Sequence, residues 1–318
     1  MNQPMLHLQE VQKITAIITN YNGRSILENC LPETHAILVA NGIREIILAD
    51  DCSTDDSLDY VSKNFPDIII SKTTQNSRFS INCNTAAKKA TGDILFFLNN
   101  DMIPKKIDSE SVRHLFKNNP NLFSCSPKIE LYPNNQLINE STCNGHFKSG
   151  WLHVSSDKPT SGQLDLSQNF PILWSCGGAM FVDRTKFNTL NGFSDIWFTA
   201  YFEDTDLGYR AWKTGWENRY LPTCVCFHHH RSTLKQLFTQ KEIDQLSLVN
   251  HYVFTWRNLT DKSYIASHLF SILFRFVFFQ FNHITAILKA LTRLPQIWRF
   301  RREFKSKRSD SFVLSQFN

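Results

Sequence analysis

Short apolar runs alternate with segments of helical spacing through residues 13–101. The runs are rich in β-branched residues, as buried strands are, and they occupy residues 13–19, 45–49, 67–70 and 93–98. Apolar residues at helical spacing lie between them, at 25–31, 57–64 and 78–90. Because strands that alternate with helices form doubly wound sheets, the pattern predicts an α/β fold with a mostly parallel central sheet flanked by helices.

Polar residues follow three of these predicted strands directly. They lie at 20–22, 50–55 and 99–101. In open parallel sheets, ligands bind beyond the carboxyl ends of the strands. We therefore expect the three clusters to converge on one crevice.

The middle of the chain is less regular. Residues 122–131 and 145–154 have an extended pattern, and 155–169 are polar as in a loop. Regular patterning returns in three segments, predicted as a strand within 174–183, a helix over 203–214 and a strand over 220–227.

The character changes beyond about residue 232, so we predict a catalytic part over 1–232 and a helical region over 233–318. Residues 264–281 are strongly apolar but are interrupted by His268 and Arg275. A membrane span needs about 20 largely uncharged residues. The basic run at 299–308 that follows favours helices lying on an anionic membrane surface. The alternative is helices packed on the catalytic part, with a solvated basic tail.

Composition excludes some classes of protein. A net charge of +5 over 318 residues is too small to indicate nucleic-acid binding. The eight cysteines form no CxxC pair, which argues against zinc ribbons and favours a reducing compartment. Residues 1–13 lack the apolar stretch of a signal peptide. We expect a cytoplasmic location, peripheral on the inner face of the cytoplasmic membrane.

Two of the polar clusters have the chemistry of nucleotide and metal sites. Carboxylates at Asp50 and Asp51 can accept hydrogen bonds from a base or a ribose, although capping of a helix explains this cluster equally well. Asp101, which follows Asn99 and Asn100, can hold Mg²⁺ or Mn²⁺, since hard cations prefer oxygen ligands. An Asn/Asp turn is the alternative there.

Two later clusters offer a base and further metal ligands. Glu203 and Asp204 open a predicted helix, where a carboxylate can act as general base or can stabilise the helix dipole. His228 and His229 end a predicted strand, where one imidazole beside a carboxylate suits Mn²⁺. A solvent-facing polar turn is the alternative.

In combination these residues resemble glycosyltransferase family 2 over about residues 13–232. The resemblance implies the GT-A fold, whose sheet is Rossmann-like, with C-terminal amphipathic helices added here. The nucleotide-sugar half would be about 13–101 and the acceptor half about 102–232. The residues at 50–55 are similar to the family's DDxSTD element, and 99–101 stand at its DxD motif with Asn in the first position.

The resemblance implies a role for each matching residue. Asp101 would be the firmer metal ligand and Asn99 a weaker one, with His228 or His229 completing the site. Asp204, in an ED motif with Glu203, would be the base. Nucleotide-sugar contacts would come from Thr19, Asn20, Tyr21, Asp50, Asp51, Asn84 and Asn100. Gly177 and Gly178 would lie on the acceptor side.

The implied activity is inverting, metal-dependent transfer of a sugar from a nucleotide-diphosphate donor to an acceptor hydroxyl in one displacement. The Asn at 99 favours dTDP-rhamnose by resemblance, and UDP-sugars stay open. The C-terminal pattern favours a lipid-linked glycan acceptor, as in surface polysaccharide or cell-wall assembly. Two rival classes remain. A nucleotidyltransferase would carry a Gly-rich, basic phosphate loop after the first strand, and residues 20–24 match such a loop poorly. The other rival is a non-catalytic protein that kept the fold.

Overall fold

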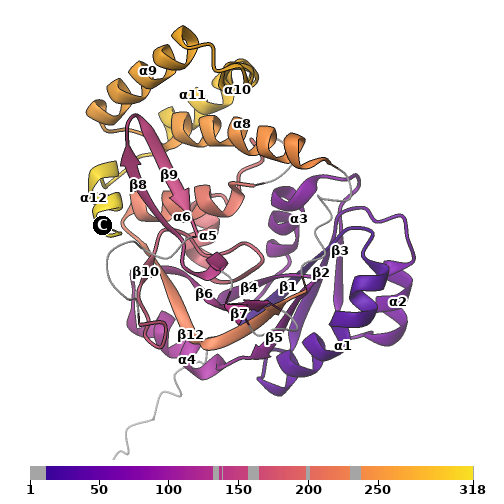
Figure 1. Ribbon diagram of the computed structural model, residues 1–318. Coiled ribbons are helices and arrows are strands. Elements are labelled where there is room, and N and C mark those ends of the chain that lie inside the picture. Colours follow the sequence, from indigo (N-terminus) through magenta and orange to yellow (C-terminus); the bar gives the residue numbers. More distant parts are fainter. Residues whose placement is uncertain are drawn as a thin grey trace, which may run out of the picture.

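In the computed structural model, a central sheet carries helices on both faces, and a helical C-terminal region lies against one end of it (Figure 1). The structure describes residues 12–131, 136–137, 139–156, 165–197, 201–229 and 238–317.

The strands alternate with helices in the first part of the chain, as the sequence predicts. The strands are β1 Ile14–Asn20, β2 Glu45–Asp50, β3 Ile69–Lys72, β4 Ile94–Asn99, β5 Met102–Lys106, β6 Leu122–Leu131, β7 Gln136–Leu137, β8 Asn144–Lys148, β9 Trp151–Ser155, β10 Pro171–Ile172, β11 Ala179–Asp183 and β12 Glu217–His228. The helices are α1 Arg24–Ala40, α2 Ser57–Asn64, α3 Arg78–Ala87, α4 Ser109–Asn118, the 3₁₀ turn η1 Asn139–Ser141, α5 Arg184–Thr189, α6 Glu203–Thr214, α8 Gln240–Asn258, α9 Lys262–Val277, α10 Phe281–Leu291, α11 Leu294–Glu303 and α12 Asp310–Ser315.

The main sheet has the order β10-β12-β6-β11-β4-β1-β2-β3. β1 to β4 pair in parallel, β11 runs antiparallel between β4 and β6, and β12 is parallel to β6. The predicted α/β fold with a mostly parallel sheet is confirmed. Because β1, β2 and β4 are neighbours in this order, their carboxyl ends lie along one edge.

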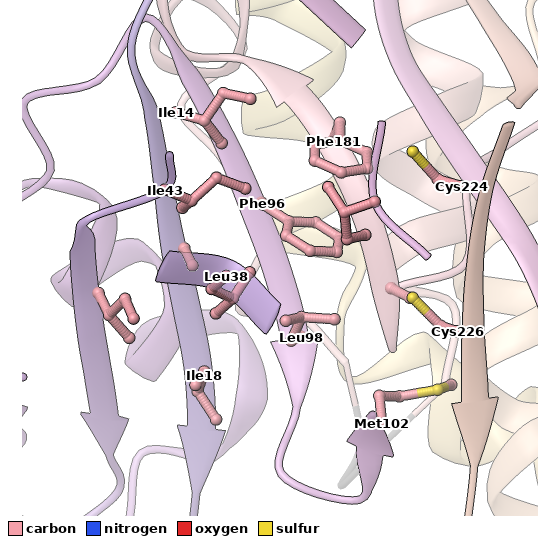
Figure 2. Packing of buried hydrophobic residues seen from close by; sticks show 14 of the residues in the cluster. Ile14, Ile18, Leu38, Ile43, Phe96, Leu98, Met102, Phe181, Cys224 and Cys226 are labelled. Atoms are coloured by element: carbon pink, nitrogen blue, oxygen red, sulfur yellow. The ribbon is translucent and has the colours of Figure 1, made fainter. Parts of the chain in front are cut away.

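Apolar side chains on both faces of the sheet hold these strands in register. Phe96 of β4 stacks on Phe181 of β11, with ring centroids 3.9 Å apart. Cys224 and Cys226 of β12 are both buried in the same cluster (Figure 2). The thiols act here as small apolar groups, and burial raises the pKa of the Cys226 thiol well above its usual value.

Helix α1 is longer than the predicted 25–31. It continues through Pro32 to Ala40 because Leu27, Leu31, Thr34 and Leu38 form one buried stripe along it. The predicted extended segment 145–154 is a separate hairpin of β8 and β9. Helix α3 ends earlier than predicted, at Ala87.

The C-terminal helices pack on the catalytic part through a shared apolar cluster. This cluster joins Leu152 and Trp212 to Val253 of α8 and Ile287 of α10. In Figure 1, α8 lies between the catalytic part and α9 to α11. No helix within the described ranges is long and apolar enough to cross a membrane.

Buried ion pairs fix α6 to α8. Asp206 of α6, which has no exposed surface, accepts hydrogen bonds from Arg210 Nε at 2.7 Å, Arg257 Nε at 3.0 Å and Asn258 Nδ2 at 2.9 Å. Burial alone would raise the pKa of Asp206, but the two arginines outweigh it and lower the pKa below its usual range.

A second buried carboxylate fixes α12 to the other end of α6. Asp310 accepts from Tyr209 Oη at 2.8 Å and Lys213 Nζ at 2.7 Å, and from the backbone N–H groups of Thr260 and Asp261. Helix α6 is therefore held to the C-terminal region at both of its ends.

We expect Asp206→Asn to destabilise the protein by about 3–5 kcal/mol, because two buried arginines would lose their counter-charge. Urea unfolding measures the loss. Since the folded-state pKa of Asp206 is lowered, its contribution is fully present above the unfolded pKa and is lost as the pH falls through the folded value. The variant should therefore lose stability less steeply than the wild type below about pH 4. Asp59→Asn, on the exposed face of α2, is the control; equal stability of the two variants would contradict this role.

Candidate active site at the carboxyl edge of the sheet

The loops after β1, β2 and β4 meet at this edge and hydrogen-bond to one another. Asn20 Nδ2 donates to Asp50 Oδ1 at 3.1 Å and to Ser53 Oγ at 3.2 Å. Asn100 Nδ2 donates to Asn20 Oδ1 at 3.1 Å. Thr19 Oγ1 donates to the Asn99 side-chain oxygen at 3.1 Å. The three polar clusters expected to converge do so.

The two acids after β2 shape the loops around them. Asp50 is fully buried and also accepts the N–H of Ser53 at 2.9 Å. Asp51 accepts from the N–H groups of Ser77 and Arg78, both at 2.7 Å, and so fixes the start of α3. The predicted contacts of both acids with a nucleotide stay a prediction.

Two predicted nucleotide contacts lie in different surroundings. Tyr21 is exposed beside the crevice, where a base can stack. Asn84 instead bridges to the loop after α5: its Nδ2 donates to the Phe193 carbonyl at 2.8 Å, and its Oδ1 accepts the Phe193 N–H at 3.0 Å. These contacts hold α3 to that loop, and the predicted nucleotide contact of Asn84 stays a prediction.

The backbone of this region is strained at several residues. Asn22, Cys52, Arg78, Tyr201 and Phe202 have φ between 46° and 77°, a range that non-glycine residues rarely adopt. Such strain persists only where the surroundings enforce it, and it is concentrated at functional sites. All five flank the loops described above or the start of α6.

Asp101 and His228 face each other across the end of the sheet. Asp101 is 7% exposed, and its Oδ2 lies 3.5 Å from His228 Nε2. The other ring nitrogen, Nδ1, lies 3.2 Å from Glu140 Oε2 on η1. Burial disfavours the charged imidazole, but the hydrogen bonds to Asp101 and Glu140 outweigh it and raise the pKa of His228 to about 9. His229 takes part through its backbone, whose N–H donates to the Asp101 carbonyl at 3.0 Å.

The Asp101–His228 pair fits a divalent cation. Two neighbouring ligands of an octahedral ion with bonds of about 2.1 Å stand about 3 Å apart, close to the observed 3.5 Å. Within the described part of the chain, no set of three His, Cys, Asp or Glu side chains is arranged to hold a metal ion. An ion here would take its other ligands from phosphate and water, as Mg²⁺ and Mn²⁺ commonly do. The Asn99 oxygen already accepts from Thr19.

Asp204 and Glu203 stand at the start of α6 in low-dielectric surroundings. Asp204 Oδ2 accepts the N–H of Gly177 at 2.9 Å, and Oδ1 accepts the N–H of Thr205 at 2.7 Å. Burial raises the pKa of Asp204 despite these bonds. Burial, with the charge of Asp204, raises the pKa of Glu203 to about 8.

Gly177 and Gly178 connect this acid pair to the end of β4. While Gly177 donates to Asp204, the carbonyl of Gly178 accepts the Asn99 N–H at 2.9 Å. A Cβ at Gly178 would come within 2.8 Å of Met102 Cε and 3.2 Å of Asn99 Nδ2, so a side chain here would have to push these two side chains aside. The two adjacent glycines thus place Asp204 next to the turn that bears Asp101.

A cavity of about 130 Å³ opens on the other side of Glu203. Its lining comes from α3, from the segment before α6 and from the junction of α10 and α11: Ser77, Arg78, Ser80, Ile81, Asp195, Trp197, Glu203 and Arg293. Glu140, which contacts His228, had no motif around it and is recognisable as part of this site only from the folded structure.

Comparison with known proteins agrees with this geometry. The family model "Glycosyl transferase family 2" matches residues 15–183, more than half of the chain. An N-acetylglucosaminyl-diphospho-decaprenol L-rhamnosyltransferase of Mycobacterium tuberculosis is 39% identical over 59 residues, which are 19% of each chain. The aligned segment thus spans about a fifth of that relative's length.

Two solved structures are similar in fold. A structure of GalNAc-T7 with UDP, GalNAc and Mn²⁺ has a TM-score of 0.60 at 14% identity, covering 78% of this chain and 48% of the other. A mannosyltransferase of Pyrobaculum calidifontis, in complex with GDP-Man and Mn²⁺, has a TM-score of 0.53 at 15% identity, covering 90% and 76%. The predicted GT-A fold is confirmed, and the chain belongs to glycosyltransferase family 2.

Proposed function

We propose that the protein transfers a sugar from a nucleotide-diphosphate donor to an acceptor hydroxyl with inversion, in one displacement, and that Asp204 is the general base. The observation that carries this proposal is the Gly177–Gly178 link, which holds the Asp204 carboxylate beside the turn that bears Asp101. The raised pKa of Asp204 makes it a stronger base than an exposed carboxylate.

We propose Asp101 and His228 as the protein ligands of a bound Mn²⁺ or Mg²⁺. Such an ion neutralises the charge that develops on the leaving diphosphate. With Glu140 accepting the proton of His228 Nδ1, Nε2 would be the nitrogen that ligates an ion beside Asp101, in place of the proton it carries there when no metal is bound. The two structural relatives described above contain Mn²⁺, which supports a divalent ion.

For the donor, dTDP-rhamnose or a UDP-sugar is our proposal. The short match to a rhamnosyltransferase supports the first, together with Asn in place of the first DxD acid. The name of that relative gives N-acetylglucosaminyl-diphospho-decaprenol as its acceptor. We propose a lipid-linked glycan in surface polysaccharide or cell-wall assembly as the acceptor class here.

The C-terminal helices present a surface that fits an anionic bilayer. Apolar side chains of α9 and its continuation into α10 are largely exposed, with Phe270 at 72%, Phe279 at 70% and Phe281 at 71%. Exposed apolar patches this dense are rare on proteins that meet only water. Exposed cations follow them along the chain at Lys289 on α10 and Arg299 on α11. We propose that this surface, which we call the α9–α10 face, lies on the inner leaflet of the cytoplasmic membrane.

Two arginines of the basic run at 299–308 contact the protein itself. Arg301 donates to the carbonyls of Trp256 and Leu259, both at 2.7 Å. Arg308 lies over the rings of Trp212 and Phe312. These two arginines stabilise the fold, and the exposed ones remain for lipid headgroups.

We expect Asp204→Asn to lower kcat by at least about a hundredfold, since general bases commonly contribute 10²–10⁴-fold. Donor affinity, measured by calorimetry, should change little. Asp59→Asn, on α2, should retain wild-type turnover. Normal turnover of Asp204→Asn would exclude this residue as the base.

We expect Glu140→Ala to weaken Mn²⁺ binding by about 10–100-fold, the usual effect of losing the carboxylate behind a histidine ligand. Electron paramagnetic resonance of Mn²⁺ titrated in the presence of UDP or dTDP measures this affinity. Glu110→Ala, at an exposed position on α4, is the control. Unchanged affinity in Glu140→Ala would contradict its positioning role, and unchanged affinity in His228→Ala would contradict the metal site itself.

We expect the purified protein to sediment with vesicles that contain phosphatidylglycerol and to do so less at high salt. The double variant Phe270→Ser with Phe279→Ser should lose binding but keep its melting temperature, because both rings are exposed. The control is Ile69→Ser, which removes an exposed apolar side chain from β3, on the far side of the sheet. Equal vesicle binding by all three proteins would refute the α9–α10 face as the contact.

A further inference from the structure

The turn that leads into α6 has a strained backbone at two consecutive residues. Tyr201 and Phe202 have φ of 72° and 77°, a left-handed conformation that residues other than glycine rarely adopt. Glu203 and Asp204 follow them directly. Because such strain persists only where the surroundings enforce it and is concentrated at functional sites, this turn indicates a functional role for at least one of its residues.

Helix α8 holds the turn in place from one side. The buried side chain of Asn250 donates from Nδ2 to the Tyr201 carbonyl at 3.3 Å. The ring of Phe202 packs against His251 and Phe254, with ring centroids 5.3 Å and 5.4 Å apart. The contacts of α8 therefore enforce the strained conformation.

The same turn leaves the Tyr201 side chain at the surface. Tyr201 is 43% exposed, whereas Phe202 is 9% exposed. Among the described residues, no hydrogen bond involves the Tyr201 hydroxyl. The exposed ring and its hydroxyl contribute little to the folded state, so stability alone does not explain why the chain presents Tyr201 in this way. A ligand that packs on the ring does explain it.

The Tyr201 ring lies among acids of the candidate site. Burial raises the pKa of the Tyr201 phenol, and the charges of Glu203, Asp244 and Glu140 raise it further. Glu203 opens α6, and Asp244 lies on α8. Glu140 lies on η1, beside the proposed metal ligand His228. The ring is therefore within reach of a molecule that approaches the proposed base.

The groups around the ring favour a neutral ligand rich in hydroxyls. The carboxylates of Glu140 and Asp244 would repel an anion and can accept hydrogen bonds from sugar hydroxyls. The C–H face of a pyranose is apolar and packs on a flat aromatic ring, while the phenol hydroxyl bonds to a polar group at the ring's edge. These are the properties of a sugar ring.

We propose that Tyr201 is the platform on which the acceptor's sugar ring stacks, so that one of its hydroxyls reaches Asp204. The inference rests on the proposed function, since it assigns a residue that selects the acceptor for that same base. The strained turn sets the position of the platform relative to the base, because only Phe202 and Glu203 separate the two residues in the chain.

The neighbourhood of Tyr201 also leads toward the α9–α10 face. Gln245, next to Asp244 on α8, donates to the Asn282 carbonyl at 3.2 Å and to Thr285 Oγ1 at 3.0 Å, both on α10. This end of α8 thus joins the surroundings of the platform to that face. A lipid tail attached to the stacked sugar lies toward the bilayer in this arrangement.

The test separates acceptor binding from the chemistry of the donor. The full-length protein receives Mn²⁺, dTDP-rhamnose or a UDP-sugar, and octyl β-glycosides of glucose, galactose and N-acetylglucosamine as acceptors. Tyr201→Asn removes the ring but keeps the backbone conformation, because Asn tolerates positive φ. We expect kcat/KM for the acceptor to fall at least about tenfold, mainly through KM. Hydrolysis of the donor without acceptor, in which water is attacked by no ring contact, should proceed at the wild-type rate.

Two further variants serve as controls. Tyr201→Phe keeps the stacking ring and should retain most of the kcat/KM for the acceptor. Phe312→Asn removes a ring that is 45% exposed from α12, which contacts the opposite end of α6, and should match the wild type in transfer and hydrolysis.

Saturation-transfer NMR without donor measures the platform independently of turnover. Saturation should pass from the protein to the pyranose protons of a bound octyl glycoside. The signal should be lost in Tyr201→Asn and retained in Tyr201→Phe and Phe312→Asn.

The remaining results discriminate between the proposals. Equal loss of hydrolysis and transfer in Tyr201→Asn would assign this residue to the base or the donor and overturn the platform. Unchanged transfer in Tyr201→Asn, or no saturation transfer to any of the glycosides in the wild type, would overturn it as well. If the wild type turns over no donor while saturation transfer depends on the Tyr201 ring, the sugar platform stands and the proposed sugar transfer fails.

Discussion

The carboxylate of Asp206 is the contact on which the arrangement of the active site depends. It lies in the same helical turn as Asp204 and pairs with Arg210 on its own helix and with Arg257 on α8. Charges buried to this degree are stable only when their partners are in place. The first turn of α6 can therefore take its observed position only when α8 is docked. Asp204 and the C-terminal region are therefore parts of one folded unit.

The rest of the site is built outward from that turn. Gly177 donates to Asp204, Gly178 accepts from Asn99, and Asn99 is bonded to Thr19 at the end of β1. From there the amides of Asn20 and Asn100 join the loops after β1, β2 and β4. Many of the polar groups at this edge thus serve to position the crevice, and fewer are available to touch substrate than the motifs alone suggest.

The sheet could be predicted well from the sequence because a short local pattern of residues indicates each strand. Runs such as residues 94–98 are apolar and bounded by polar turns, and the order of such runs determines which strand ends meet. The length of α1 was missed because Pro32 indicates a helix end, whereas burial of Leu38 keeps the helix going. Burial of that kind depends on tertiary packing and cannot be read from a short window.

The side-chain contacts of the candidate site were harder to predict, because they too depend on tertiary structure. Motif spacing proposed Asp101, Asp204 and the histidine pair as candidates, and only the fold shows that the His228 ring lies beside Asp101 while the backbone N–H of His229 donates to the Asp101 carbonyl. Asn84 lies within a recognisable sequence pattern, yet its side chain hydrogen-bonds to the backbone of Phe193, 109 positions away. Glu140, which contacts His228, comes from a segment without any motif, so no pattern in the chain could have identified it.

The pairing of α6 with α8 and α12 bears on how such enzymes can be recombined. A junction near residue 232 looks natural, because the family motifs end there and the helices begin. A chimera cut at that point would keep Asp206, Tyr209 and Lys213 from one parent and receive Arg257 and Asp310 from the other. A chimera should therefore fold more readily when α6 is exchanged together with the C-terminal helices, as one cassette, than when the helices are exchanged alone.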